Sequence, residues 1–196
     1  MEQKQVWNSI AESWYNFRHW PIRIAKKLSK EWQPGKILDI GCGNSRNLLP
    51  FYQNNFTCYG IDFSENVIEL AKKYISKHEM KVNLKIANAE NLPYKNNFFD
   101  YCLSLAVLHH VKNKEKAIQE IYRVLKPNGK AIICVWNKLQ LKFLFRKKET
   151  YIKWGKYSRY YYFFSYFELK KLLKKSGFKI FKSNFFGKNI CFIVEK

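Results

Sequence analysis

Short apolar runs alternate with longer helical patterns along most of the chain. Runs typical of strands cover residues 36–40, 59–62, 82–86, 98–104 and 130–136. Apolar residues recur at helical spacing within residues 6–28, 67–75, 117–125 and 165–177. Helices that alternate with strands predict an α/β fold with a doubly wound, mostly parallel sheet.

The last third of the chain departs from this alternation. Residues 178–183 and 189–194 predict two closing strands, which we expect to pair as a C-terminal antiparallel hairpin. Residues 138–164 are basic, aromatic and irregular, and we interpret them as an insertion that covers the ligand crevice. A length of 196 residues favours a single domain. Its predicted parts are a helical cover (1–32), a cofactor-binding core (33–137), the insertion (138–164), and a closing helix with strands (165–196).

The strand at residues 36–40 runs directly into a glycine turn, in the sequence KILDIGCGN of residues 36–44. Gly41 and Gly43 allow a tight turn and a close approach of the backbone to a ligand. A dinucleotide turn would need a third glycine, but Arg46 stands at that position. Asp39 at the strand end would repel a pyrophosphate and attract a cationic sulfonium with an ammonium group. The turn therefore predicts S-adenosylmethionine as the ligand, with a purely structural crossover as the alternative.

A second acid supports this interpretation. Asp62 closes the strand at residues 59–62, about 20 residues beyond the turn, where a βαβ unit places a carboxylate on a ribose diol. A single Asp at a strand end is more often a helix cap or a solvated group. Two acids at successive strand ends, one of them beside a glycine turn, favour a ligand site.

Charge is the unusual feature of the composition, with a formal net charge of +21. Residues 138–196 hold 16 basic and 3 acidic residues, against 20 and 12 in the preceding 137 positions. Such a surface attracts polyanions and makes nucleic acid the leading partner. The alternative is a solvated, lysine-rich surface without a polyanionic partner.

The cysteines and the hydrophobic runs bear on metal sites, disulfides and membrane spans. The five cysteines form no C-x-x-C pair, so we expect neither a zinc site nor a disulfide, and interpret them as buried free thiols. No run is apolar enough to span a bilayer, and the first residues lack a signal-peptide core. We therefore expect no membrane partner and a cytoplasmic location.

Four motifs resemble the class I S-adenosylmethionine-dependent methyltransferases. They are residues 38–43 (LDIGCG), 60–64 (GIDFS), 88–93 (NAENLP) and 123–129 (RVLKPNG). The resemblance implies a Rossmann-like methyltransferase fold with a seven-stranded sheet. It also implies that S-adenosylmethionine is bound by Asp39, Gly41, Cys42, Gly43, Asp62, Phe63, Asn88, Ala89 and Leu105.

A narrower resemblance is to the tRNA wobble-uridine 5-carboxymethyl methyltransferases. It rests on residues 6–11 (VWNSIA), 18–21 (RHWP), 104–110 (SLAVLHH), 159–163 (RYYYF) and 168–169 (EL). That family esterifies the carboxylate of 5-carboxymethyluridine in the tRNA anticodon loop. Its small zinc-binding activator subunit would dock on the edge strand near Val82 to Ile86.

The chain also departs from that family. Its stretch at residues 18–21 is shorter, and the long insertion before the arginine–tyrosine motif is nearly absent. Asn88 replaces the usual Asp that accepts from the adenine amino group. An Asn oxygen can still accept that bond, although without charge.

The resemblance implies that three residues act on the substrate. Arg18 and Arg159 would clamp a carboxylate or phosphate, and His110 would donate a hydrogen bond. The alternatives are a surface role for Arg18 and a packed or capping role for His110. No general base is needed, because a carboxylate is ionised at neutral pH. The aromatic run of residues 160–164 should divide between base stacking and the core. Two alternatives remain: a methyltransferase for a quinone or lipid precursor, and a non-catalytic RNA-binding scaffold.

Overall fold

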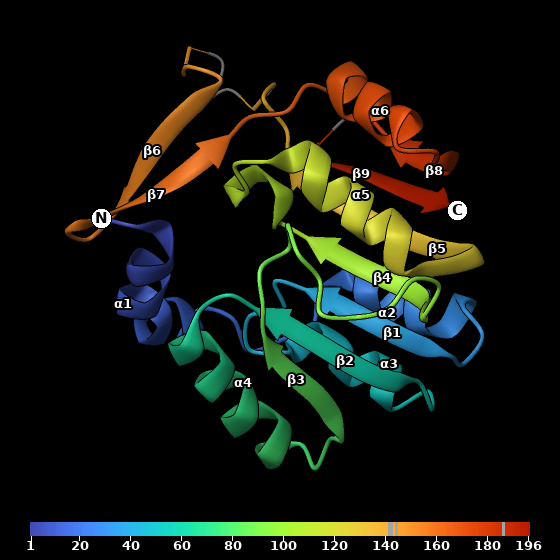
Figure 1. Ribbon diagram of the computed structural model, residues 1–196. Coiled ribbons are helices and arrows are strands. Elements are labelled where there is room, and N and C mark those ends of the chain that lie inside the picture. Colours follow the sequence, from blue (N-terminus) through green and yellow to red (C-terminus); the bar gives the residue numbers. More distant parts are fainter. Residues whose placement is uncertain (141–142, 144, 186) are drawn as a thin grey trace. The chain divides into compact units, whose positions relative to one another are not determined.

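The computed structural model describes residues 1–140, 143, 145–185 and 187–196 (Figure 1). These residues divide into two compact units, unit 1 (1–88) and unit 2 (89–196), and each is described by itself. Three positions of the predicted insertion, 141, 142 and 144, lie outside the described residues. The organisation as one domain stays a prediction.

Unit 1 consists of three parallel strands and their connecting helices. Its elements are α1 (Gln3–Tyr15), α2 (Arg23–Glu31), β1 (Lys36–Ile40), η1 (Arg46–Leu48), α3 (Leu49–Tyr52), β2 (Thr57–Asp62), α4 (Glu65–Lys77) and β3 (Val82–Ile86). β2 pairs in parallel with both β1 and β3. The helix after the glycine turn is short, as Pro50 predicts: one 3-10 turn precedes the four residues of α3.

Local chemistry explains the helices of unit 1. The Ser64 hydroxyl accepts from the Val67 backbone N–H and caps α4, which confirms the predicted start of this helix. The apolar side of α4 packs against α1, where Ala11, Val67 and Leu70 form a buried cluster. Trp20 and Pro21 separate α1 from α2, as predicted.

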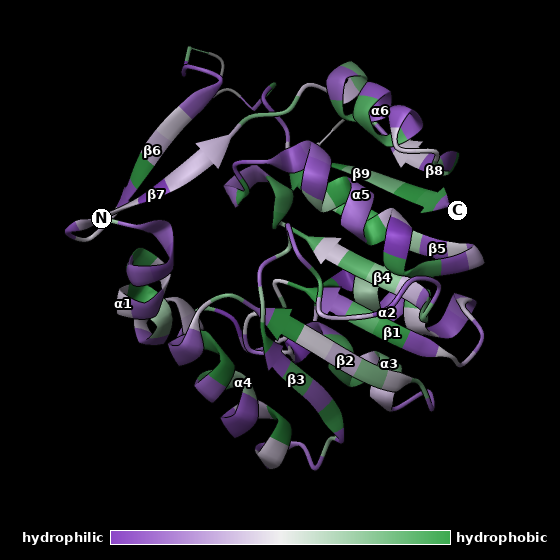
Figure 2. Ribbon diagram, viewed as in Figure 1, coloured by the Kyte–Doolittle hydropathy of each residue, from purple (hydrophilic) through white to green (hydrophobic). Residues whose placement is uncertain are grey.

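Unit 2 contains four strands of the main sheet and a separate hairpin. Its elements are β4 (Phe99–Leu105), η2 (Leu108–His110), α5 (Lys114–Val124), β5 (Leu125–Trp136), β6 (Glu149–Trp154), β7 (Tyr157–Tyr162), α6 (Tyr166–Lys175), β8 (Lys179–Asn184) and β9 (Asn189–Glu195). β4 and β5 are parallel, whereas β9 is antiparallel to β5 and β8. Apolar and polar residues alternate in stripes along α5 and α6 (Figure 2), and the apolar stripe is buried.

The seven-stranded sheet has the order β3-β2-β1-β4-β5-β9-β8. Its parallel strands and closing antiparallel pair confirm the predicted fold class. β6 and β7 form a two-stranded antiparallel sheet of their own, which the irregular pattern of the insertion did not predict. Among the residues that the structure describes, no helix has the length and apolar character to cross a bilayer.

The prediction of five free thiols is wrong for two of them. Cys134 and Cys191 lie directly opposite each other in β5 and β9, 4.1 Å apart between Cα atoms, and form a disulfide. Cys42, Cys58 and Cys102 are free and buried, as expected. The two bonded residues are 57 positions apart in sequence, and only the strand register brings them together.

Candidate active site

The glycine turn of unit 1 is held in shape by Asp62. Gly41 and Gly43 have φ angles of 62° and 56°, in the region that favours glycine. The Gly43 N–H donates to Asp62 Oδ2 over 3.2 Å, and the Ser64 N–H donates to Oδ1 over 3.1 Å. A Cβ on Gly43 would lie 2.6 Å from the ring of Trp14. The turn therefore requires glycine both for its φ angle and for the space that Trp14 occupies.

Asp39 is the least satisfied acid of this turn. It is 1% exposed, and its Oδ2 has no hydrogen-bond partner among the described residues. Burial raises the pKa of Asp39 to about 8, although the charge of Arg46 lowers it, and the charge of Asp62 raises it further. A buried carboxylate in this state gains most from a cationic ligand. We call Asp39 and Asp62 the acidic cluster.

Asp62 differs from Asp39 in its hydrogen bonds. Burial raises the pKa of Asp62 to about 6, and the backbone N–H groups of Ser64, Gly43 and Phe63 counteract this rise. Both of its oxygens already accept backbone bonds, so Asp62 shapes the turn. Each carboxylate oxygen can accept more than one bond, so a ligand hydroxyl could still be held.

Arg46 is a candidate residue that the sequence analysis did not identify as functional. Burial lowers the pKa of Arg46 to about 10, as does the charge of Arg18, whereas Asp39 raises it. Its guanidinium lies 5.7 Å from the ring centre of Trp14, and that of Arg18 lies 5.9 Å from the same ring. A half-buried cation beside Asp39 could hold an anionic group of a zwitterionic ligand. The signal in the sequence was Arg46 itself, at the position where a dinucleotide turn has glycine.

The other predicted cofactor residues lie at the ends of strands. Cys42 is buried, and its N–H donates to the Ile61 carbonyl over 2.8 Å. Phe63 is half-buried after β2, and Asn88 is exposed after β3. In unit 2, Ala89 is the first residue and is buried, and Leu105 is half-buried at the end of β4. The structure thus groups Asp39, Gly41, Cys42, Gly43 and Asp62 within unit 1.

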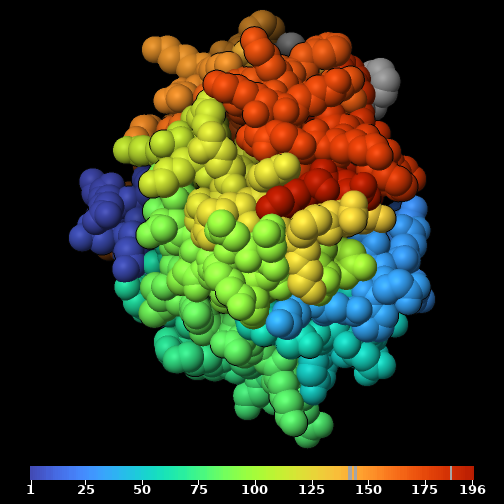
Figure 3. Space-filling view, turned by 45° about the vertical axis from the view of Figure 1, so that its right-hand side comes forward, coloured from blue at the N-terminus to red at the C-terminus, as the bar shows by residue number. Residues whose placement is uncertain are grey.

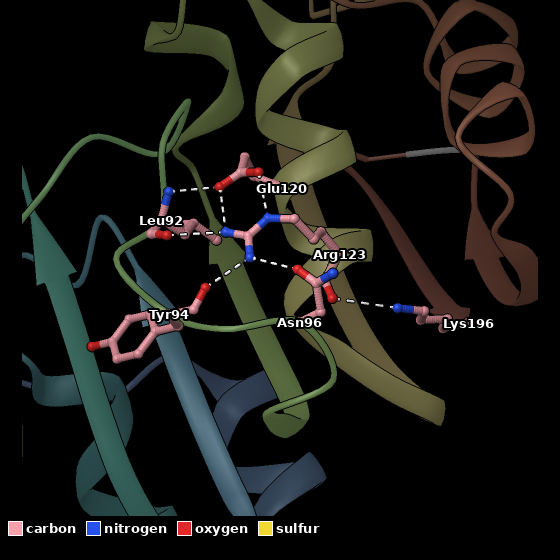
Figure 4. A network of polar contacts seen from close by, with 6 residues as sticks. All are labelled: Leu92, Tyr94, Asn96, Glu120, Arg123 and Lys196. Atoms are coloured by element: carbon pink, nitrogen blue, oxygen red, sulfur yellow. Dashed lines mark hydrogen bonds and ion pairs between the residues drawn. The ribbon is translucent and has the colours of Figure 1, made fainter.

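An arginine on α5 secures the loop that follows Ala89 (Figure 4). Arg123 donates to the carbonyls of Leu92 and Tyr94 and to the side chain of Asn96, over 2.7–3.0 Å. Glu120 pairs with Arg123 at 2.7 Å and accepts the Leu92 N–H at 2.7 Å. Leu92 of the motif at residues 88–93 and Arg123 of the motif at residues 123–129 therefore belong to one network within unit 2.

The second polar group lies in unit 2 and consists of His109, His110 and Arg159, which we call the histidine–arginine cluster. Burial lowers the pKa of His109 well below its ordinary value and that of His110 to about 4. The His110 Nδ1–H donates to the Tyr160 carbonyl over 2.8 Å, so Nε2 of this neutral imidazole is an acceptor. The predicted donation from His110 to a substrate does not fit this arrangement.

Arg159 is buried between aromatic rings of the hairpin. It is 7% exposed, and its guanidinium carbon lies 4.6 Å from the ring centre of Trp154 and 5.3 Å from that of Tyr161. Its charge contributes to the low pKa values of both histidines. Arg18, the other predicted clamp, is an exposed residue of unit 1. The structure therefore groups His110 with Arg159 within unit 2, whereas Arg18 belongs to unit 1.

The predicted division of the aromatic run between stacking and core is wrong. All five residues of 160–164 are at most 7% exposed, and Tyr161 and Phe163 belong to a core cluster with Phe143. Rings sealed in this way cannot stack on a base. The exposed aromatic residue of the hairpin is Tyr151, at 56%, which the sequence pattern did not distinguish.

The fold and the glycine turn define a class of enzymes that transfer methyl groups. The family described as a methyltransferase domain matches residues 38–133. A methyltransferase structure from Methanosarcina mazei aligns with a TM-score of 0.76 at 22% identity, covering 84% of this chain and 93% of that one. A methyltransferase from Haloferax volcanii, solved in complex with the activator Trm112, aligns with a TM-score of 0.78 at 13% identity over 98% and 95% of the two chains. These likenesses show the fold.

The chain belongs to the S-adenosylmethionine-dependent methyltransferases. It is 33% identical to mouse tRNA (carboxymethyluridine(34)-5-O)-methyltransferase ALKBH8, over 69% of this chain and 20% of that protein. The Schizosaccharomyces pombe protein with the same activity in its name is 27% identical over 98% and 95% of the two chains. A ubiquinone biosynthesis O-methyltransferase from Pelagibacter ubique is 31% identical over 76% and 71%. The chain spans less than half the length of the first curated relatives that it matches.

Proposed function

We propose that this chain methylates tRNA, and that its substrate group is the carboxylate of 5-carboxymethyluridine at the wobble position. The observation that carries the proposal is the histidine–arginine cluster, where a buried guanidinium lies beside a histidine whose pKa is lowered to about 4. Such a site suits an anionic group that needs no deprotonation. The relatives with tRNA (carboxymethyluridine(34)-5-O)-methyltransferase in their names support the same substrate.

The residues of the turn fit S-adenosylmethionine. An unpartnered buried oxygen on Asp39 suits its ammonium group, Arg46 would hold its carboxylate, and Asp62 would accept from its ribose. Asn88 and Ala89 would contact the adenine, and Leu105 the methionine chain. When bound, this cofactor supplies an activated methyl group on a cationic sulfur. The protein's contribution is then mainly to position the acceptor.

On the substrate side, the carboxylate would take the methyl group without losing a proton. Arg159 would orient it through paired hydrogen bonds, and Arg18 would add an exposed positive charge. His110 would accept a hydrogen bond from the nucleotide through Nε2. The product would be an ester, because one carboxylate oxygen would form the bond to the methyl carbon while the sulfur–methyl bond breaks and the neutral thioether leaves.

A second candidate is methylation of a phenol, which the Pelagibacter ubique relative favours. A phenol has a pKa of about 10 and must lose its proton for the reaction. The lowered pKa of about 4 makes His110 a weak base for that step. The physical argument therefore favours the carboxylate.

The basic surface of unit 2 supports a polyanionic substrate. Exposed lysines lie along α6 (Lys171, Lys174, Lys175) and on β8 (Lys179, Lys182). Residues of α6 and β8, coloured orange to red, form a continuous face in Figure 3. Binding to tRNA through such a face should weaken steeply as the salt concentration rises.

An activator subunit would dock on the outer edge of unit 1. β3 is the last strand of the sheet order, and Ile86 on it is 52% exposed. A cavity of about 510 Å³ lies beside the strand, lined in part by Ile75, Met80 and Leu84. Edge strands of this kind can accept a strand from a partner, and the Haloferax volcanii neighbour was solved with its activator. Co-purification with an activator should be lost in Ile86→Asp and kept in the control Lys72→Asp on α4.

Methyl transfer from labelled cofactor to bulk tRNA tests the function. We expect label in tRNA that mild alkali releases as volatile methanol, because esters hydrolyse under these conditions. Label that survives alkali would reject the ester, and label in a phenolic quinone precursor alone would favour the second candidate. Binding of tRNA without any transfer by the protein and its activator would favour a scaffold.

A further inference from the structure

A polar cavity lies within unit 2 on the side of the hairpin opposite to Arg159. It has a volume of about 360 Å³ and is lined by Lys112, Glu149, Thr150, Tyr151 and Tyr160. Tyr151 and Tyr160 are paired in the register of β6 and β7, and their rings meet edge to face at 5.9 Å. The next pair along the strands, Ile152 with Arg159, faces the other side of the hairpin.

We propose that this cavity binds the base of a nucleotide that neighbours the methylated uridine. The proposal rests on the proposed function and adds a second subsite to it. Its volume is within the range of small-ligand pockets. Tyr151 is 56% exposed and Tyr160 is 4% exposed, so one ring is available for stacking and the other is fixed in the wall. Unstacked bases are commonly held on such aromatic rings.

The charges of the cavity determine how a nucleotide would lie in it. Glu149, whose side chain is 60% exposed, lies 3.9 Å from Lys114 and accepts from the Tyr160 hydroxyl. Burial, followed by this carboxylate, raises the pKa of Tyr160 to about 12, so the hydroxyl keeps its proton. The carboxylate repels phosphate and attracts N–H donors, so the base edge points to Glu149 and the phosphate to Lys112.

This arrangement predicts a base preference. A carboxylate accepts from exocyclic amino groups, as in its pairing with cytosine N4. Cytosine, adenine and guanine carry such a group, whereas uracil has no exocyclic amino group and its ring N3–H is flanked by two carbonyl oxygens that Glu149 would repel. The neighbour of the methylated uridine should therefore be a base with an amino group.

Tyr160 connects this cavity to the proposed substrate residues. Its backbone carbonyl accepts the Nδ1–H of His110 over 2.8 Å, and its neighbour in the chain is Arg159. Tyr162, two residues further along β7, carries the Lys114 ammonium 3.8 Å from its ring centre. The same short strand thus holds a residue for the modified uridine and a wall of the second subsite.

The test uses the full chain, with its activator if one is needed, and anticodon stem-loop RNAs that carry the modified uridine. The base on either side of that uridine is varied among cytosine, adenine and uracil. For Tyr151→Ala we expect KM for RNA to rise on the order of 10-fold, with an unchanged affinity for the cofactor. Tyr151→Phe keeps the ring and should behave like the parent protein.

Glu149→Gln tests the base preference separately. An amide can also donate to a carbonyl, so this variant should lose the discrimination against uracil. Lys112→Ala removes the positive charge that would face the phosphate. Lys156→Ala on the hairpin turn is its control, because it also removes one positive charge. A parent-like KM in Tyr151→Ala together with a parent-like base preference in Glu149→Gln would overturn the proposal.

Direct binding separates this proposal from the proposed function. If the parent protein methylates no tRNA, anisotropy of a labelled single-stranded hexanucleotide still reports the cavity. Weaker binding by Tyr151→Ala than by Tyr151→Phe would support a nucleotide site. Equal binding by both variants would reject it, as would competition by an unmodified peptide but not by cytidine monophosphate.

Discussion

Two buried polar groups of opposite character lie in the two units. The acidic cluster of unit 1 has carboxylates whose pKa values burial raises to about 8 and about 6. The histidine–arginine cluster of unit 2 has imidazoles whose pKa values burial lowers. In each case burial suppresses the charge that the side chain would carry in water. A cation restores the charge of the acidic cluster, so the first group suits a cation. In the second group the histidines stay neutral, and the buried guanidinium of Arg159 is what suits an anion.

This contrast is the physical basis for assigning cofactor and substrate to different residues. A cationic methyl donor gains from Asp39, and an ionised carboxylate gains from Arg159. Neither cluster would suit the other ligand, because like charges in a buried site repel strongly. The predictions that follow aim to break this contrast, from the largest expected effect to the smallest.

Replacing Asp39→Asn should have the largest effect, a loss of cofactor affinity of about 3–5 kcal/mol, because the ligand's ammonium group loses a buried partner. Isothermal titration measures this, with Asp100→Asn of unit 2 as the control. Parent-like affinity in Asp39→Asn would remove Asp39 from the site.

The same variant should be more stable than the parent at pH 8. The folded state keeps the Asp39 proton up to a pKa of about 8, whereas the unfolded chain loses it near the ordinary pKa of 3.8. Stability from this group therefore falls as pH rises through that window. Thermal unfolding at pH 5 and pH 8 should show a smaller fall for Asp39→Asn than for the parent.

Arg123→Met tests a network that belongs to neither cluster. The free energy of unfolding should fall by about 2–3 kcal/mol, because Glu120 and two loop carbonyls lose a charged partner. Chemical denaturation measures the change, with the exposed Arg23→Met as the control. An unchanged stability would show that the bonds in Figure 4 contribute nothing net.

Arg159→Met should lower kcat/KM for tRNA by a factor that corresponds to about 2 kcal/mol, while the cofactor affinity stays unchanged. Arg159→Lys keeps the charge but not the paired geometry, and should lie between Arg159→Met and the parent. Lys153→Met on the same hairpin is the control. A fall in cofactor affinity without an effect on tRNA would reverse the assignment of the two clusters.

The smallest effect concerns pH. Cofactor affinity of the parent should rise on the order of 10-fold from pH 6 to pH 8, as Asp39 ionises. Affinity for tRNA should lack a step from His110 in this range, because a pKa lowered to about 4 keeps it neutral throughout. Titrations at constant salt compare the two. A flat cofactor profile in the parent, matching that of Asp39→Asn, would contradict the raised pKa.

Most of the fold could be predicted from local patterns. Short apolar runs located the strands, and apolar residues at helical spacing located the helices, because each strand buries one face and each helix one stripe. The glycine turn and the acids at the ends of β1 and β2 were visible because their chemistry is local. Arg46 was visible as a residue, but its burial beside Asp39 was not.

The substrate side depended on packing between distant segments. In residues 159–162, large side chains occupy both alternating faces of β7, so no period distinguishes core from surface. Only the tertiary structure showed that residues 160–164 are buried and that Tyr151 is exposed. The carbonyl that accepts from His110 belongs to Tyr160, 50 residues further along the chain. Its position determines which imidazole nitrogen of His110 carries the proton.

By itself, the sequence determined the class of fold, the order of the elements outside the insertion, and the glycine turn with its two acids. These follow from periodicity and from conformations of neighbouring residues. The tertiary structure alone decided the disulfide between Cys134 and Cys191, the burial of Arg46 and Arg159, and the cavity beside Tyr151. Those features depend on strand register and on which surfaces cover one another, and such contacts join residues that no local pattern relates.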